Sequence, residues 1–75
     1  MGSKYPVLNS KKILSILGKF GFEIISQKGS HIKLRKIDET VRTVIVPDHY
    51  EVAKATLQSI LEQAGISIEE FLKKM

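Results

Sequence analysis

The sequence contains no cysteine and no tryptophan, and it has only two prolines. Without a thiol the chain can form neither a disulfide framework nor a cysteine-ligated metal site, so apolar packing must hold the fold together. No apolar run approaches the roughly 20 residues that a membrane-spanning helix needs. Residues 1–6 lack the apolar core of a signal peptide, and Pro6 departs from the myristoylation pattern. These absences favour a cytoplasmic protein.

The length and composition are those of a small globular protein, with 75 residues, 43% hydrophobic and 27% charged. A chain of this length predicts one domain over residues 1–75, whose thin core buries roughly 60% of the surface that the unfolded chain exposes. Twelve basic residues against eight acidic ones give a formal charge of +4. This charge favours a polyanionic partner, either nucleic acid or an acidic protein.

A first amphipathic helix is predicted over about Ser10–Lys19. Either Asn9 or Ser10 can accept hydrogen bonds from the free N–H groups at its start, and Gly21 is suited to end it. Its apolar residues recur at three- and four-residue spacing and are expected on one face: Ile13, Leu14, Leu17 and Phe20.

A second helix and a short third one are predicted in the last third of the chain. The second helix ends at Gly65, and the run Ser67–Glu70 resembles a capping box that opens the third. The second helix has an apolar stripe of Ala53, Leu57, Ile60, Leu61 and Ala64, and the third carries Phe71 and Leu72.

Three strands are expected between the long helices, over Phe22–Lys28, Ser30–Ile37 and Val41–Val46. A polar turn over residues 37–40 separates the last two, and Pro47 follows the third. Short connections predict an antiparallel meander, and one apolar stripe on each long helix predicts that both cover the same sheet face. The fold class is therefore α+β, in the order α-β-β-β-α with a short C-terminal helix.

The stretch Gln27–His31 is the most distinctive part of the sequence. Gly29 can take a positive φ without steric cost, so it predicts a tight reversal between two strands. The reversal would place Ser30 and His31 at the mouth of a hairpin, with Lys28 opposite. A hydroxyl, an imidazole and an ammonium group together suit phosphate chemistry better than core packing.

Most of the chain resembles the HicA toxin family. The similar segments occur in order and at matching spacing: Gly21–Phe22, Gln27–Arg35, Val46–His49, Thr56–Ser67 and Glu69–Leu72. The most specific parts are Gly-Ser-His after a strand, and Thr-Leu-x-Ser-Ile-Leu followed by Ala-Gly-Ile-Ser. Either motif alone would be weak evidence, and the two together at this spacing are strong.

The resemblance implies a fold like the double-stranded RNA-binding domain and the activity of a ribosome-independent mRNA endonuclease. It also implies a HicB antitoxin that covers the active site, and a catalytic role for His31. No metal or cofactor is expected. The chain departs from the family at Ala55, where glycine is usual, and we interpret this position as one that only starts the helix.

Chemistry accounts for a catalytic histidine, because imidazole gives or takes a proton near neutral pH. RNA carries its own nucleophile, the 2′-OH, so His31 could act as general base toward it or as general acid toward the departing 5′-oxygen. From the residues alone, an ordinary exposed turn histidine is the simpler interpretation. With the family motif, catalysis is favoured.

Phosphate contacts are predicted for a set of polar and basic residues. Lys28 and Ser30 flank the histidine in sequence, Lys33 and Arg35 share its face of the strand, and Lys54 lies near the start of the second long helix. A closed turn for Ser30 and a solvated sheet face for Lys33 and Arg35 are alternatives of similar weight, whereas for Lys28 alone plain solvation is favoured.

The roles of His49 and Tyr50 stay open. His49 could form an acid–base pair with His31, although a role within its loop is favoured. Tyr50 could stack on a base or pack against the protein. Zinc is not expected, because two histidines without cysteine are too few ligands. A non-catalytic RNA-binding module of the same fold, or a protein-interaction domain with a basic face, would also fit the residues.

Overall fold

The computed structural model describes residues 7–38 and 40–75, and within them the predicted order of elements is confirmed. Residues 1–6, and Glu39 of the expected turn, lie outside the described residues. The helices and strands are α1 (Ser10–Lys19), β1 (Glu23–Lys28), β2 (His31–Ile37), β3 (Val41–Pro47), α2 (Lys54–Ala64) and α3 (Ile68–Lys73).

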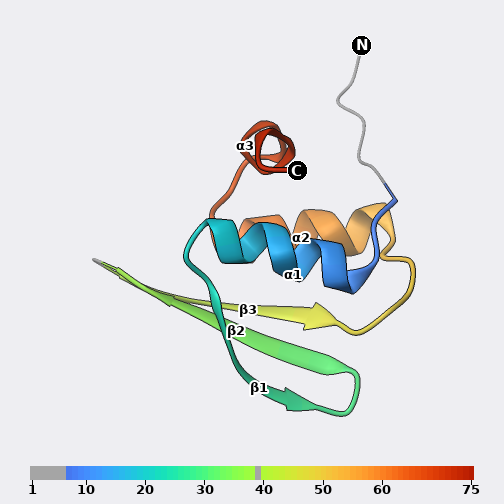
Figure 1. Ribbon diagram of the computed structural model, residues 1–75, viewed down its shortest axis with the longest axis horizontal. Helices are drawn as coiled ribbons and strands as arrows, with labels where there is room; N and C mark the ends of the chain where they lie inside the picture. Colours follow the sequence, from blue (N-terminus) through green and yellow to red (C-terminus); the bar gives the residue numbers. More distant parts are fainter. Residues whose placement is uncertain (1–6, 39) are drawn as a thin grey trace.

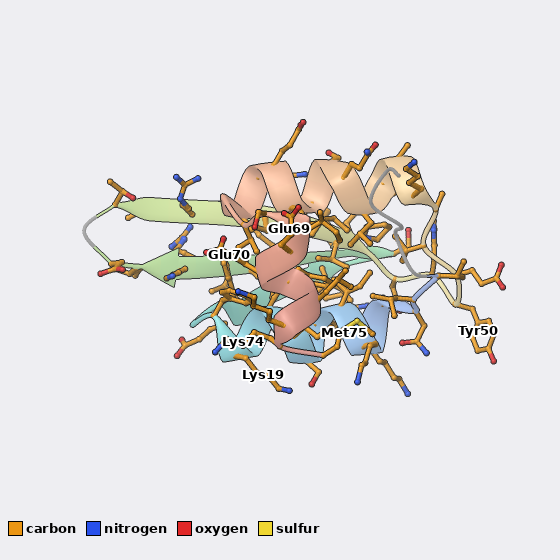
Figure 2. All side chains as sticks on the ribbon, turned by 90° about the horizontal axis from the view of Figure 1, so that it is seen from above. Lys19, Tyr50, Glu69, Glu70, Lys74 and Met75 are labelled. Carbon is orange, nitrogen blue, oxygen red and sulfur yellow. The ribbon has the colours of Figure 1, made fainter. Side chains whose placement is uncertain are left out.

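The three strands form an antiparallel sheet in the order β1-β2-β3. The helices α1 and α2 lie side by side on one face of this sheet, and α3 lies across them on the side away from the sheet (Figures 1 and 2). This is the α+β fold of the double-stranded RNA-binding domain type. No helix in the described ranges is both long and apolar enough to cross a membrane.

Local sequence signals explain where the helices begin and end. Asn9 is the cap of α1, because its side chain accepts a hydrogen bond of 2.8 Å from the backbone N–H of Lys12. The capping box at Ser67 is present, with Glu70 as the reciprocal partner. Gly65 ends α2 with a φ of +72°, a backbone conformation that favours glycine.

The core lies between the sheet and the helices. It includes Ile32 and Leu34 of β2 together with the predicted core residues of α1 and α2: Ile13, Leu17, Leu57, Ile60 and Leu61.

The expected face of α1 needs a correction. Ile16, which was not expected there, is only 1% exposed, whereas Leu14 and Phe20 are partly buried at the margin of the core. Because α1 is covered by the sheet on one side and by α3 on the other, the direction of these neighbours decides which residues are buried (Figure 1).

The strand boundaries differ from the expected ones by one residue each. The strand β1 begins at Glu23, β2 begins at His31 after a two-residue turn, and β3 extends to Pro47. The proline fits because β3 is an edge strand, where its missing N–H leaves the pairing with β2 intact. Every residue of β1 is exposed, because β1 is the edge strand that lies beyond the cover of the helices.

Candidate functional site

The β1–β2 hairpin forms the reversal that the sequence predicts. Lys28 and His31 are directly paired at its end, and Gly29 has a φ of +60° in the turn between them. Directly paired residues in an antiparallel sheet point to the same side, so the ammonium and imidazole groups lie on one face. Lys28 therefore lies opposite His31, as the sequence predicts, and Ser30 lies in the turn between them.

His31 is the first residue of the central strand, with Lys28 paired on one side and Pro47 on the other. Its neighbours Ile32 and Leu34, which are 5% and 1% exposed, face the helices, so alternation directs His31 to the open face. In the described part of the chain, no hydrogen bond or ion pair engages the imidazole. The ring is exposed and accessible to a ligand.

Asp48 connects the hairpin to the rest of the molecule. Its backbone N–H donates to the carbonyl oxygen of Ser30 at 2.7 Å. Its carboxylate accepts from the hydroxyl of Ser10 at 3.1 Å and from the side-chain amide of Gln27 at 3.4 Å. The same Gln27 amide lies 3.3 Å from the carbonyl oxygen of Gly29. Asp48 thus joins the hairpin turn, the end of β3 and the start of α1.

His49 lies in the loop after β3, close in sequence to the residue that pairs with His31. The backbone of His49 is engaged on both sides, since its N–H donates to Pro47 and its carbonyl accepts from Ser10. Its side chain lines a pocket at the start of α1 with Asn9 and Tyr50. The loop role that we favoured for His49 fits these contacts. Tyr50 is 87% exposed and points away from the body of the molecule (Figure 2).

The predicted phosphate contacts fall into two groups. Lys33 and Arg35 occupy alternate positions of β2 after His31, so they share its open face as expected, and both are half-buried. Lys54 is the first residue of α2, and α2 begins at the same end of the sheet as the hairpin (Figure 1). No ion pair engages Lys28, Lys33 or Arg35 within residues 7–38 and 40–75.

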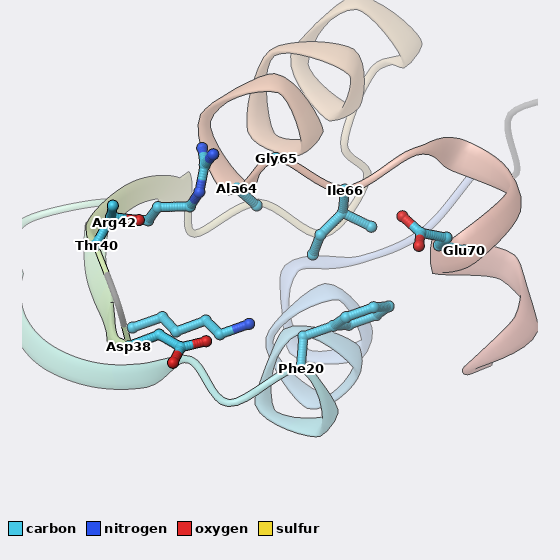
Figure 3. Close-up of a pocket in the computed structure, with 9 residues that line it drawn as sticks. Phe20, Asp38, Thr40, Arg42, Ala64, Gly65, Ile66 and Glu70 are labelled. Carbon is cyan, nitrogen blue, oxygen red and sulfur yellow. The ribbon is translucent and has the colours of Figure 1, made fainter.

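In the part of the chain that the structure describes, neither a metal site nor the pocket at the far end of the sheet forms part of this site. Among the described residues, no group of three or more His, Cys, Asp or Glu side chains could hold a metal ion. A pocket of about 230 Å³ lies at the far end of the sheet, where Arg42 lies against Gly65 at the end of α2 (Figure 3). Its lining mixes the cations Lys36 and Arg42 with acidic side chains, so it is no simple anion site.

The sequence reasoning missed Asp48, Gln27 and Ser10 as residues that fix the hairpin. Ser10 is only 3% exposed, and a buried hydroxyl needs a partner. For Asp48, the sequence signal is that a polar residue follows a proline at a strand end. This signal does not reveal the partners of Asp48, because they come from segments that only the tertiary fold brings together.

Comparison with known families identifies the family of this chain. A family model of the HicA toxin of bacterial toxin–antitoxin systems matches residues 10–66. The chain belongs to the HicA toxin family. It is thus the toxin of a toxin–antitoxin pair and has an antitoxin as its partner. The matched residues of this HicA toxin extend from α1 past the end of α2 and include both histidines, while α3 lies beyond them. Neither the curated proteins nor the solved structures that were compared gave a match.

Proposed function

We propose that this HicA toxin is an endoribonuclease that cleaves mRNA without a metal ion or other cofactor, with His31 as general acid or base. The observation that carries the proposal is the exposed imidazole, paired across the hairpin with Lys28 and free of protein partners among the described residues. The family membership supports it, because the histidine belongs to the matched stretch.

The chemistry needs little beyond one proton-transfer group. The 2′-oxygen of RNA attacks the adjacent phosphorus and loses its proton, while the bond from phosphorus to the 5′-oxygen breaks and that oxygen gains a proton. His31 would carry one of these two proton transfers and water the other, a contribution of typically 10²–10⁴-fold in rate. Lys28 would stabilise the charge that develops on the phosphorane oxygens. The products are a 2′,3′-cyclic phosphate and a 5′-hydroxyl.

RNA binding would use the cations around the hairpin. Lys28, Lys33 and Arg35 line the open face, and the Ser30 hydroxyl and Lys54 lie at its hairpin end. Contacts of this kind go to phosphates, so they supply affinity and position the strand without reading its sequence. We further propose that the antitoxin is of the HicB type and covers this face, that the toxin acts in the cytoplasm, and that residues 1–75 form one domain.

The test is RNA cleavage by the purified protein in EDTA, with His31→Ala and His49→Ala as matched variants. We expect the parent and His49→Ala to produce fragments that end in 2′,3′-cyclic phosphate, and His31→Ala to produce none. A 3′-hydroxyl at the new ends would contradict the mechanism. Equal cleavage by the parent and His31→Ala would show that the catalytic residue is another or that a contaminant cuts.

A second candidate function is a non-catalytic RNA-binding module. One observation favours it: within the described residues no side chain orients the imidazole of His31, whereas catalytic bases are commonly held by a third group. This module would shift RNA on a native gel, and neither the parent nor His31→Ala would cut it.

A further inference from the structure

The end of the open sheet face farthest from His31 carries three exposed aliphatic side chains. Ile37 and Val41 are paired across β2 and β3, and their side chains are 75% and 62% exposed. Ile25 of β1 is 43% exposed and lines one pocket with Ile37. The helices cover only the opposite face (Figure 1). Since a sheet face in water is normally polar, exposed aliphatic side chains on it indicate a binding surface.

Arg35 lies among these side chains and is incompletely satisfied. Its Nε atom is buried and has no hydrogen-bond partner. Glu23 is paired with Arg35 in the sheet register, yet the described structure contains no ion pair between them. The guanidinium borders a pocket of about 200 Å³, lined also by Gly21, Glu23, Ile25 and Ile37. A buried N–H without an acceptor is unfavourable, and a carboxylate in the two-pronged geometry that arginine prefers would relieve it.

We propose that Ile25, Arg35, Ile37 and Val41, here called the distal patch, anchor the antitoxin through its aliphatic side chains and a carboxylate. RNA is the poorer occupant, because phosphates gain nothing from isoleucine and valine. A second copy of this chain is also poorer, since it would bring Arg35 and Lys33 against their own equivalents in a chain of net charge +4. The inference rests on the antitoxin partner of the proposed function and does not depend on the role of His31.

The size of the sheet explains how a partner anchored at the distal patch would inhibit the toxin. Seven residues at about 3.3 Å each and three strands at about 4.8 Å spacing give the open face an area on the order of 300 Å². A stable interface buries about 800 Å² per partner. An antitoxin on the distal patch therefore needs more surface than this patch offers, and one that covers the whole open face also covers His31, at the other end of β2.

The experiment measures the Kd of the separately purified antitoxin encoded with this chain for the parent and three variants. Ile37→Asp places a charge in the distal patch, and Arg35→Gln removes the guanidinium. Ile24→Asp is the matched control: Ile24 is 57% exposed but pairs with Leu34, which faces the helices. We expect the first two variants to bind at least about tenfold more weakly, and the control to change by less than about twofold.

RNA cleavage by the same proteins separates the possible occupants. Ile37→Asp should cut RNA like the parent and should escape inhibition at an antitoxin concentration that silences the parent. Unchanged antitoxin binding by Ile37→Asp and Arg35→Gln overturns the proposal, as does an equal loss in Ile24→Asp. Slower RNA cleavage with unchanged antitoxin binding assigns the face to RNA and overturns it too.

Two controls keep the result interpretable. Circular dichroism melting shows whether each variant folds, and Val41→Asp replaces Ile37→Asp if the latter does not. A parent that binds antitoxin in the expected pattern but cuts no RNA contradicts the endoribonuclease proposal and leaves the distal patch supported. A parent that cuts RNA while all variants bind antitoxin equally supports the endoribonuclease proposal and overturns the distal patch.

Discussion

At the scale of single residues, the geometry of the candidate site depends on a side chain that is not itself on the open face. Asp48 accepts hydrogen bonds from Ser10 and Gln27, and its backbone N–H donates to Ser30. The hairpin that carries His31 is therefore fixed at its turn as well as along β2. Such anchoring matters for catalysis, because a displacement of about 1 Å can lower a rate on the order of 100-fold.

Replacing Asp48 by alanine should loosen the hairpin. The buried hydroxyl of Ser10 would lose its acceptor, which costs about 1–3 kcal/mol of unfolding free energy. We expect this loss in urea denaturation, together with faster amide hydrogen exchange at residues 29–31. The amide in Asp48→Asn keeps one acceptor oxygen, so this variant should lose less. Unchanged hydrogen exchange in Asp48→Ala would show that the turn holds itself.

At the scale of elements, α3 is the helix that lies outside the family match. The match ends at residue 66 and α3 begins at Ile68, yet Phe71 of α3 is 0% exposed and belongs to the core. The ammonium group of Lys19, at the end of α1, also donates to the carbonyl of Lys74 at 2.8 Å. We infer that α3 completes the core of this chain.

Removing the ring of Phe71 tests this inference. Phe71→Ala should lower the free energy of unfolding by about 3–5 kcal/mol, because a fully buried ring leaves a cavity. Small proteins are stable by only about 5–15 kcal/mol, so a large fall in Tm should accompany it. The adjacent, partly buried Leu72 provides the control, and Leu72→Ala should cost clearly less in the same urea titration. Equal losses would mean that α3 packs loosely.

At the scale of the whole molecule, the fold separates two kinds of surface. One end of the sheet carries the hairpin and the starts of α1 and α2, and cations continue from it along the open face (Figure 1). The other end of the same face carries exposed aliphatic side chains. This division predicts that RNA depends mainly on the cationic part and antitoxin mainly on the aliphatic part, with Arg35 where the two parts meet.

The salt dependence of RNA binding measures the cationic part. If three or four cations contact phosphates, log K for single-stranded RNA should fall with log salt concentration with a slope on the order of −2 to −3. Lys33→Ala should reduce this slope by about 0.7, whereas Lys73→Ala, on α3, should leave it unchanged. A flat salt dependence in the parent would falsify RNA binding by these cations and favour the hypothesis of a protein-interaction domain.

The sequence by itself determined the local features of this HicA toxin. The boundaries of α1, the capping box at Ser67 and the reversal at Gly29 were predictable because each depends on residues adjacent in the chain. The place of Lys28 opposite His31 was predictable from the reversal at Gly29, although the expected strands left one residue in the turn and the structure has two. The alternation of β2 then placed Lys33 and Arg35 on the face of His31.

Only the tertiary structure decided the features that join distant segments. The link from Asp48 to Ser10 joins the end of β3 to the start of α1, and the packing of the start of α1 against the loop after β3 determines it. The burial of Ile16 and the exposure of Ile37 follow from which face the helices cover, and an apolar residue has the same sequence signal in either place. Packing direction is a property of the assembled elements, and for that reason the distal patch was visible only in the fold.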